Sequence, residues 1–351
     1  MKNNKKALIE VYKEINSRIK TIDFNLLYPG FKPVDFALYN DKIVVFKDKV
    51  IPYDSRFVGN TAIFFEDSYL AIWKLDSIYV HYNILTSKIV HEMFHAWQFS
   101  NNELRFPNEF LGLRYLYEKF NLGLKFDETK YLLKAYEDDD FTALETFISL
   151  RNKRKKDYVN EISYEEGIET IEGMARYVEL KALKELDFSE FQKSYEQLKS
   201  LIKNLNNYIP IRVISYEIGA LMMLVKDKYN LSIEHQIGIE TRNIYNILFD
   251  DIEYKDIPYE DNNLNFSFLE EYYQKMTLRI SSVLSSNPKI ISCDSVIGFD
   301  PLNSFQIGKY IYFRHFVMIK IGHQQIFVHN ESVGETDDLN RVFVIYEKKT
   351  I

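Results

Sequence analysis

The stretch His91-Glu92-Met93-Phe94-His95 decides how the rest of the chain is interpreted, because it matches the pattern H-E-x-x-H. An α-helix has about 3.6 residues per turn, so residues four apart lie one above the other and both imidazoles can bind a single ion. Glu92 lies about 100° round the helix, where its carboxylate can contact a water molecule on that ion without binding the ion itself. Two imidazoles and a neighbouring carboxylate are what a zinc hydrolase takes from one helical turn.

On its own this pentad is a weak signal. With 7 histidines in 351 residues, independent draws give such a pentad in roughly one chain in a hundred of this length. The competing interpretation is a buried helix with two hydrogen-bonded core histidines. A third metal ligand elsewhere in the chain decides between the two interpretations.

The composition is that of a folded globular protein, since 46% of the residues are hydrophobic and 27% are charged. The 26 tyrosines and 26 phenylalanines, against 12 glycines and 8 prolines, indicate long, well-packed elements. A net charge of −7 argues against a nucleic-acid or membrane-surface binder, because phosphate binding needs a concentrated positive field. The one basic run, Arg151–Lys156, is expected to be a solvated helix end, because acidic runs lie close to it on both sides.

Cys293 is the only cysteine, so no disulfide can form within the chain. The N-terminal residues lack an uninterrupted apolar segment of the kind found in secretory signals. The longest notable apolar stretch, Ile218–Val225, is far too short to span a bilayer. These features predict a cytoplasmic protein without a membrane-spanning segment.

The hydrophobic patterns divide the chain into three parts. Residues 1–84 are expected to form an amphipathic helix over 5–20 and a small sheet of short β-branched and aromatic strands between 34 and 80. Residues 85–287 are expected to be helical, with helices at 85–99, 107–121, 127–136, 139–155, 161–186, 190–207, 211–229, 232–249 and 266–286. Residues 288–351 alternate around the turn candidate Gly322-His323 and predict a C-terminal β-rich module. The expected fold class is α+β, predominantly helical with two small β regions.

The third ligand is best sought in the run Glu165–Glu179, where glutamates recur at 165, 166, 169, 172 and 179. A solvated acidic helix face explains this spacing equally well. The glutamates are, however, interspersed with apolar residues, and Gly173 follows Glu172 directly. A second helix can approach closely at such a small residue.

The segment Glu172-Gly-x-Ala-x-Tyr-Val-Glu179 resembles the helix that supplies the glutamate ligand of zinc in aminopeptidase N-type gluzincins. In those enzymes a glutamate from a second helix completes the site begun by the H-E-x-x-H helix. The resemblance implies that Glu172 is the third ligand, and Glu169 and Glu166 remain the alternatives.

A further segment, Ile214-Ser-Tyr-Glu-Ile-Gly-Ala220, is similar to the part of the same enzymes whose tyrosine stabilises the tetrahedral intermediate. The resemblance implies that the Tyr216 hydroxyl points at the oxyanion. The other interpretation is a tyrosine packed in an apolar helix. Three such signals in the same order are much less expected by chance than the pentad alone.

Two departures limit the resemblance. Glu172 comes 77 residues after His95, a much longer interval than in the aminopeptidase N group, so several helices are expected between the two ligand helices. No Gly-x-Met-Glu-Asn segment, which anchors the free amine of the substrate in those enzymes, precedes the pentad. The resemblance therefore implies a zincin-like catalytic core of the gluzincin type and not an aminopeptidase.

The sequence thus predicts a zinc metallopeptidase that acts on peptides or proteins, with one Zn²⁺ per chain held by His91, His95 and Glu172. Glu92 is expected to activate a water molecule as general base, and Tyr216 to stabilise the oxyanion. The alternative is a catalytically silent metallopeptidase-like protein that binds or regulates a partner. Endopeptidase and exopeptidase action both stay open, as does the oligomeric state.

Three supporting roles are expected around this centre. Glu179 or Glu169 is the candidate for the carboxylate that orients a histidine ligand. The segment Asn60–Trp73 is the candidate sheet edge for an extended peptide, because it precedes the pentad helix. Arg212 either meets a carbonyl or carboxylate of the substrate or bridges two helices.

Overall fold

A computed structural model describes residues 2–47, 49–75, 81–233, 237–259, 264–337 and 341–349, with side chains from residue 7 onward. Within this part of the chain the fold is mixed α and β: helices make up 51% of the structure and the strands form three small sheets. The expectation of a helical majority with small sheets is therefore confirmed. Every helix in the described ranges is too short or too polar to cross a membrane.

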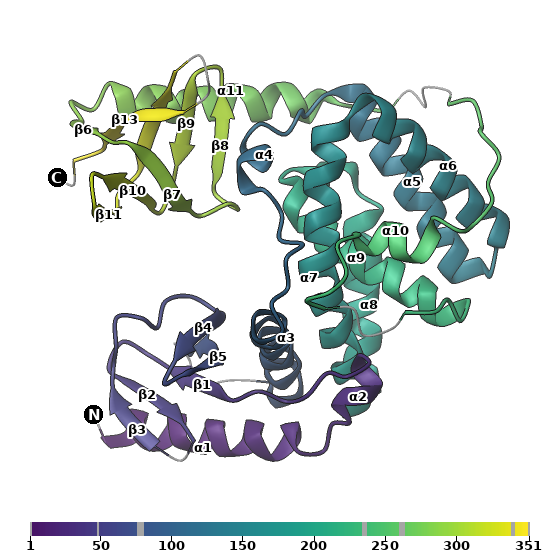
Figure 1. Ribbon diagram of the computed structural model, residues 1–351, viewed down its shortest axis with the longest axis horizontal. Helices are drawn as coiled ribbons and strands as arrows, with labels where there is room; N and C mark the ends of the chain where they lie inside the picture. The colour runs from purple at the N-terminus through teal and green to yellow at the C-terminus, as the bar shows by residue number, and fades with distance from the viewer. Residues whose placement is uncertain are drawn as a thin grey trace.

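The N-terminal part is a helix packed on a five-stranded sheet (Figure 1). Helix α1 (Lys2–Ile19) precedes the short α2 (Phe24–Leu27) and the strands β1 (Phe36–Tyr39), β2 (Ile43–Phe46), β3 (Lys49–Pro52), β4 (Thr61–Phe65) and β5 (Ser68–Lys74). The strand order is β3-β2-β1-β5-β4, with β1 and β5 parallel and the other pairs antiparallel. Strand β4 thus forms one edge of the sheet.

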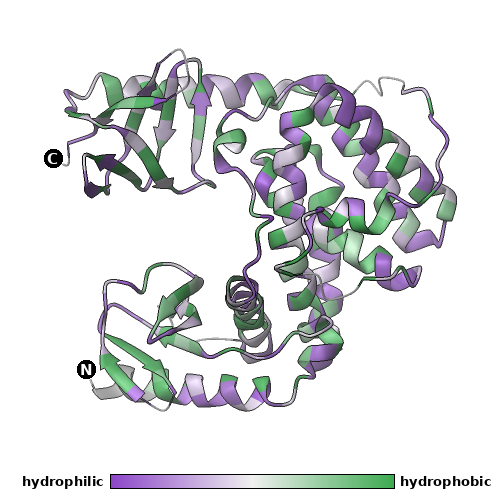
Figure 2. Ribbon diagram, in the orientation of Figure 1, coloured by the Kyte–Doolittle hydropathy of each residue, from purple (hydrophilic) through white to green (hydrophobic). Residues whose placement is uncertain are grey.

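The turn that places β4 at this edge contains Glu66 and Asp67, whose φ angles are 47° and 63°. Two positive φ angles in a two-residue loop are typical of a hairpin whose twist matches that of its strands. The strands themselves are rich in hydrophobic residues, as the green colour of this sheet in Figure 2 shows. One face of the sheet has its own apolar cluster, and the other packs on α1 and α3.

Helix α3 (Tyr82–Ser100) carries the pentad and lies between the N-terminal sheet and the helical region (Figure 1). His81 caps its start, since the imidazole Nδ1 accepts a hydrogen bond from the amide of Ile84 at 3.5 Å. Phe94 and Trp97 are buried against Tyr28, with ring centroids 5.3 and 5.8 Å from that ring. Helix α3 is therefore buried over most of its surface.

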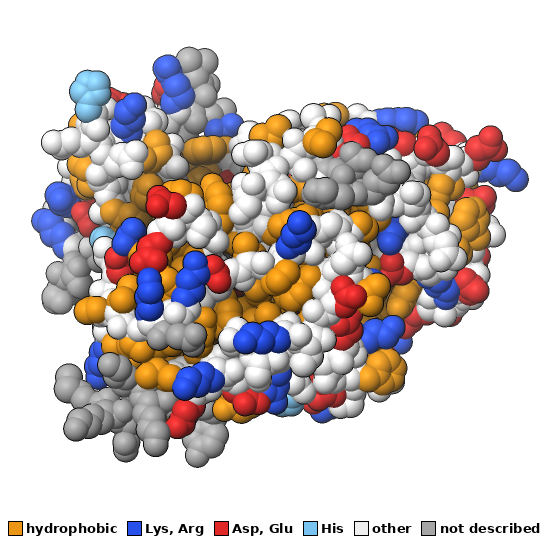
Figure 3. All heavy atoms as spheres, turned by 60° about the horizontal axis from the view of Figure 1, so that its bottom comes forward, with side chains coloured by type: hydrophobic (Ala, Val, Ile, Leu, Met, Phe, Trp, Pro, Cys, Tyr) orange, Lys and Arg blue, Asp and Glu red, His pale blue; other side chains and the backbone are white. Residues whose placement is uncertain are grey.

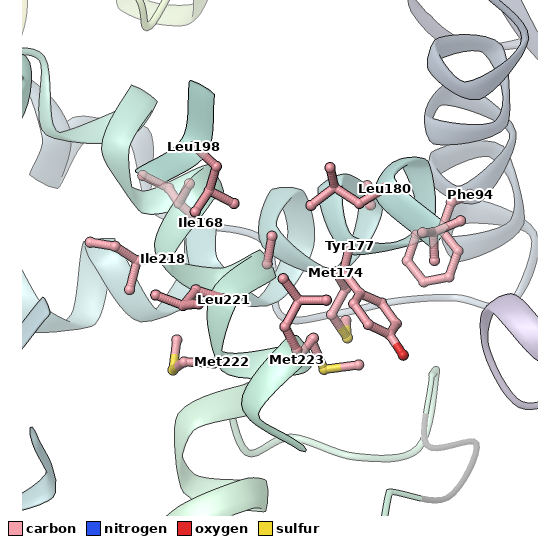
Figure 4. Close-up of a cluster of buried hydrophobic side chains, with 14 of the residues drawn as sticks. Phe94, Ile168, Met174, Tyr177, Leu180, Leu198, Ile218, Leu221, Met222 and Met223 are labelled. Carbon is pink, nitrogen blue, oxygen red and sulfur yellow. The ribbon is translucent and has the colours of Figure 1, made fainter. Parts of the chain in front are cut away.

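The helical region is built around α7 (Val159–Leu186), which packs on α3, α6, α8 and α9. The other elements are α4 (Glu109–Leu113), α5 (Lys119–Asp138), α6 (Phe141–Asp157), α8 (Phe188–Ile202), the 3₁₀ turn η1 (Leu205–Tyr208), α9 (Ile211–Lys228) and α10 (Ile244–Phe249). Figure 4 shows the apolar core between α7 and α9, with Met174 and Tyr177 on the first helix and Leu221 and Met223 on the second.

Helices α7 and α9 approach each other most closely at a pair of glycines. A Cβ added to Gly173 would lie 2.5 Å from the Cα of Gly219, closer than the non-bonded contacts that real Cβ atoms make. The small residue beside Glu172 therefore has the role expected for it, because it lets a second helix come close. That second helix is the one that carries Tyr216.

Two of the expected helices are wrong in their bounds. Residues 114–118 are not helical, and α5 begins at Lys119 because the Glu118 side chain accepts hydrogen bonds from the amides of Phe120 and Asn121. The helix expected over 232–249 is reduced to α10, which starts after Asn243, whose side chain caps the amide of Asn246. Residues 234–236 of that expected helix lie outside the described residues.

The interpretation of the basic run as a solvated helix end is wrong for two of its residues. The side chains of Arg151 and Arg154 on α6 are fully buried. Arg151 binds Glu169 of α7 at 2.8 Å and Glu128 of α5 at 2.8 Å, and Arg154 binds Glu128 at 2.9 Å. Two further charged groups complete this buried network: Lys125 of α5 lies 2.8 Å from Glu165 of α7, which also pairs with Arg154.

The C-terminal β region contains two sheets and the helix α11 (Ser267–Leu284). Its strands are β6 (Lys289–Ser292), β7 (Ser295–Phe299), β8 (Ser304–Ile307), β9 (Tyr310–Phe313), β10 (Val317–Ile321), β11 (Gln324–Val328), β12 (Ser332–Thr336) and β13 (Val342–Glu347). They form the sheets β11-β10-β7 and β6-β13-β12-β9-β8. The predicted turn at Gly322-His323 joins β10 to β11, and Gly322 has the φ of 59° that favours glycine.

Helix α11 packs on the second of these sheets, with Met276, Ile280 and Val283 buried against Tyr312 and Val333. Figure 1 shows α11 running from the helical region across the β region. On the face seen in Figure 3, lysines and arginines alternate with acidic residues over the surface and form no concentrated basic patch there.

Candidate metal centre

Three predicted ligands converge between α3 and α7. His95 Nε2 lies 3.1 Å from His91 Nε2 and 3.0 Å from Glu172 Oε2, and His91 Nε2 lies 3.7 Å from the same oxygen. Among the described residues these three form a group whose ligand atoms all lie within 4.8 Å of one another. Helical spacing on α3 and the close approach of α7 are enough to bring them together.

The hydrogen bonds behind the two imidazoles leave lone pairs facing the centre. Glu179 Oε2 lies 3.2 Å from His91 Nδ1, so Nδ1 carries the proton and donates it to that carboxylate. His95 Nδ1 lies 2.8 Å from Gln98 Oε1, and the Gln98 amide nitrogen donates to the Ile171 carbonyl, which fixes the amide oxygen toward the ring. In their neutral forms both imidazoles therefore present an unprotonated Nε2 to the centre.

Three acceptor atoms thus meet with no donor between them: two imidazole nitrogens and one carboxylate oxygen. Such an arrangement is repulsive unless a cation or a proton lies at its middle. The separations of 3.0 to 3.7 Å also fit the roughly 3.3 Å expected between ligands that sit about 2.0–2.1 Å from a tetrahedral Zn²⁺. These residues therefore fit a zinc ion, to which Glu172 would contribute one oxygen.

The two alternatives for the third ligand lie elsewhere. Glu169 is fully buried in the charge network with Arg151 and Lys125, 2.8 and 2.9 Å away. Glu166 pairs with Lys155 at 3.0 Å and accepts a hydrogen bond from Asn243 at 2.7 Å. Both carboxylates are one or two turns before Glu172 on α7 and face other helices.

Arg212 of α9 holds the second oxygen of Glu172. Its Nη2 donates to Glu172 Oε1 at 2.9 Å, and its Nη1 donates to Glu109 Oε1 of α4 at 2.5 Å. Glu109 in turn accepts a hydrogen bond from the Tyr164 hydroxyl at 3.0 Å. Arg212 thus bridges α9 to α7 and α4, and the bridge orients Glu172 Oε2 toward the histidines; its other expected role, a contact with substrate, stays a prediction.

Arg176 binds one oxygen of Glu179, just as Arg212 binds one oxygen of Glu172. It donates to Glu179 Oε1 at 2.6 Å and to Glu217 of α9 at 3.2 Å, so Glu179 Oε2 is left for His91. Burial alone would raise the pKa of the Glu179 carboxyl, but Arg176 and His91 hold that pKa at about 2. Burial likewise opposes a proton on His91, yet Glu172 and Glu179 raise the pKa of that imidazole to about 10 when no metal competes.

Glu92 is only 9% exposed, and within the described residues no hydrogen bond or ion pair engages its carboxylate. Burial raises the pKa of this carboxyl, which the neighbouring His91 and His95 partly counteract. It lines a pocket of about 460 Å³ together with His91 and Tyr216. A buried carboxylate without a partner, facing a pocket beside three convergent ligand atoms, is placed to exchange protons with a molecule in that pocket.

Tyr216 lies on α9 one helical turn after Arg212, whose guanidinium is 5.6 Å from the centre of its ring. Burial, followed by the charge of Glu172, raises the pKa of the Tyr216 phenol, so the hydroxyl keeps its proton and can donate it. The ring is partly buried and lines the same pocket as Glu92. Tyr216 is thus brought to the centre with the four residues of α3 and α7.

Several residues of the centre were not identified from the sequence. Gln98 sits one turn after His95 on the same helix face, a spacing that could have revealed it. Glu109 and Glu217 come from α4 and α9, and no local pattern connects them with the pentad. Arg176 interrupts the row of glutamates on α7, and its role depends on Glu217, which is 41 residues away.

Comparison of the chain with protein-family models, with curated proteins and with solved structures gives no match.

Proposed function

We propose that the protein is a zinc-dependent metallopeptidase of the gluzincin type, with Zn²⁺ held by His91, His95 and Glu172. The observation that carries the proposal is the convergence of three lone-pair atoms at 3.0 to 3.7 Å beside the partnerless buried carboxylate of Glu92. A structural histidine pair needs neither the convergence nor the free carboxylate. The position of α3 against a sheet with an exposed edge strand supports a zincin-like fold.

Zinc supplies Lewis acidity at such a site, where it acidifies a water molecule and polarises a carbonyl group. Glu92 takes the proton of the attacking water at its carboxylate and later gives that proton to the leaving nitrogen. Tyr216 donates its hydroxyl hydrogen to the oxygen that becomes negative as the carbonyl carbon turns tetrahedral. Glu179 and Gln98 keep the two histidines in the tautomers that ligate.

The substrate is a peptide or protein segment in extended form. Strand β4 borders the sheet, and its outer edge bears the backbone groups that β5 does not pair. An extended peptide can add to such an edge by main-chain hydrogen bonds. Because β4 and β5 both contact α3, a peptide on that edge lies on the side of the sheet that leads to the pentad helix.

A digest of a peptide library by the purified protein, with and without a metal chelator, tests the proposal. We expect cleavage that stops with the chelator and returns with zinc. The variant Glu92→Gln should bind zinc with unchanged stoichiometry and cleave nothing, because ligation and proton transfer are carried by different residues. Glu196→Gln is the matched control, since this side chain is 66% exposed on α8.

Near-normal cleavage by Glu92→Gln would remove Glu92 as the general base. Purified protein that contains no stoichiometric zinc, or that binds zinc and cleaves no peptide of the library, would instead favour a silent metallopeptidase-like binding protein. Mass analysis of the cleaved products separates endopeptidase from exopeptidase action in the same experiment.

A further inference from the structure

A second cavity, of about 510 Å³, is lined in part by Arg212, whose guanidinium binds Glu172 of the candidate metal centre. Arg212 and Tyr164 line it on one side, and these are the residues that hold Glu172 and Glu109. On the other side are α11 and the segment 301–308, which includes β8. A volume of this size is within the range of cavities that bind small molecules or substrate groups, about 300–1,000 Å³.

The charge of this cavity is opposite to that of the whole protein. Its described lining includes four cationic side chains, those of Arg114, Arg212, Lys275 and Arg279, and no carboxylate. The chain as a whole has a net charge of −7. Arg212 is already paired with Glu109 and Glu172, so the local positive field that attracts an anionic group comes chiefly from Lys275 and Arg279.

Two of these cations come from one face of α11. Tyr272, Lys275, Met276 and Arg279 all line the cavity, at the three- and four-residue spacing that places side chains on the same side of a helix. Within the described residues, neither Lys275 nor Arg279 forms an ion pair with a carboxylate. Arg279 lies over the ring of Tyr312, 5.9 Å from its centre, which leaves its hydrogen-bond donors for another group.

The remaining lining is aromatic and hydrogen-bonding. Tyr117 and Tyr273 contribute rings to the wall, and the Tyr273 hydroxyl donates to the Tyr117 carbonyl at 3.0 Å, which joins α11 to the segment before α5. The Tyr117 hydroxyl accepts from the Ile211 amide at the start of α9 at 2.9 Å. These contacts connect the α11 wall to the helix that carries Arg212 and Tyr216, so the cavity keeps its position relative to the metal centre.

We infer that this cavity is a specificity subsite that binds a carboxylate of the peptide substrate, on the side of the cleaved bond nearest Arg212. The inference rests on the proposed function, because a peptide substrate can reach the α11 wall of this cavity only if it is also bound at the metal centre. An extended chain advances about 3.3 Å per residue, so the position of the recognised carboxylate along the peptide measures how far Lys275 and Arg279 lie from the cleaved bond. A glutamate or aspartate side chain and a free C-terminus share this chemistry.

The test uses zinc-loaded Glu92→Gln, which should bind peptides without cleaving them. The probes are labelled eight-residue peptides that differ at one position, glutamate against glutamine, each made with a free and with an amidated C-terminus. We expect one acidic probe to bind about tenfold more tightly than its neutral counterpart, as a charge-assisted hydrogen bond supplies. If replacing glutamate by glutamine weakens binding, the recognised carboxylate is a side chain; if amidation weakens it, the recognised carboxylate is the C-terminus.

In the double variant Lys275→Gln/Arg279→Gln the tenfold preference should disappear. The single variant Lys275→Gln, which changes an exposed side chain and leaves the Arg279 contact with Tyr312 in place, should lose part of it. The matched control Lys289→Gln/Lys320→Gln removes the same charge from the same β region outside the cavity and should keep the preference.

Equal binding of acidic and neutral probes, or a preference that survives in the double variant, overturns the inference. The unmutated zinc-loaded protein separates this outcome from a failure of the proposed function. If acidic and neutral peptides are cleaved at equal rates, the carboxylate subsite is rejected and the proposed peptidase function is kept. If no probe is cleaved but binding depends on a carboxylate and is abolished in the double variant, the carboxylate site is kept and the proposed peptidase function is rejected.

Discussion

The guanidinium of Arg212 binds one oxygen of Glu172 at 2.9 Å, while the other oxygen lies 3.0 Å from His95 Nε2. The two oxygens of one carboxylate therefore have different partners, a fixed cation on α9 and the ligand histidines on α3. This division sets the direction in which Glu172 faces the metal centre. It also means that an arginine with no place among the ligands should control metal binding.

We predict that Arg212→Met lowers zinc affinity by about 10- to 100-fold, the usual range for a group that orients a metal ligand. Without the guanidinium, Glu172 can rotate and Glu109 loses its partner. Chelator competition measures the affinity directly and does not depend on activity. Arg56→Met, at an exposed arginine 59% accessible, is the control, and an unchanged zinc affinity in Arg212→Met would contradict the role assigned to the bridge.

Replacing Tyr216 by Phe should lower kcat by about a hundredfold or more and leave the zinc content unchanged, because in the proposed reaction the hydroxyl acts on the oxyanion and binds no metal. Stopped assays with a cleaved library peptide give kcat, and elemental analysis gives the zinc content. Tyr229→Phe removes a hydroxyl at the end of the same helix, where it donates to the Ala135 carbonyl at 2.9 Å, and should keep kcat. A kcat within twofold of the unmutated protein would remove Tyr216 from the reaction.

Adding a methyl group at Gly219 should destabilise the protein and loosen the metal centre together. A Cβ there would lie 2.4 Å from the Glu169 carbonyl oxygen, so α7 and α9 must separate. Overpacking of this kind costs about 1–3 kcal/mol in the free energy of unfolding. Gly298→Ala is the control, since its new Cβ would be 3.6 Å from the nearest atom, an ordinary contact. Urea unfolding of both variants and their zinc affinities provide the comparison.

The metal-free protein should show an acid-dependent stability contribution from Glu179. Its carboxyl pKa is about 2 in the folded chain against an ordinary 4.5, because Arg176 and His91 outweigh the effect of burial. A depressed pKa gives stability that is present above about pH 4.5 and is lost as the pH falls toward 2. The difference in unfolding free energy between the unmutated protein and Glu179→Gln should therefore shrink over this interval.

Urea unfolding at several pH values, followed by the fluorescence of Trp73 and Trp97, measures that difference. Glu196→Gln again serves as the control and should match the unmutated protein at every pH. A difference for Glu179→Gln that stays constant from pH 7 to pH 3 would show that its charge does not contribute in the way proposed.

The sequence was informative where the signal is local. The pentad predicted helix α3 with two imidazoles on one face, and the run around Glu172 and Gly173 predicted a carboxylate near those imidazoles and a close helix approach. It failed where partners come from distant elements. Arg151 and Arg154 were expected at a solvated helix end, because the carboxylates that neutralise them lie on other helices, α5 and α7. The start of α5 was missed because the Glu118 side chain caps the helix there, although the hydrophobic periodicity continues through that position.

The buried charges of α5, α6 and α7 also constrain how this protein reaches its fold. Lys125, Arg151 and Arg154 have no exposed side-chain surface, and neither do the carboxylates that neutralise them. Burying the charged side chains of one helix before the other two have packed against it would be unfavourable, because an unpaired charge in an apolar interior is far less stable than the same charge in water. We therefore expect the three helices to dock together, and a change that keeps them apart should also displace α7, which carries Glu172 and Glu179.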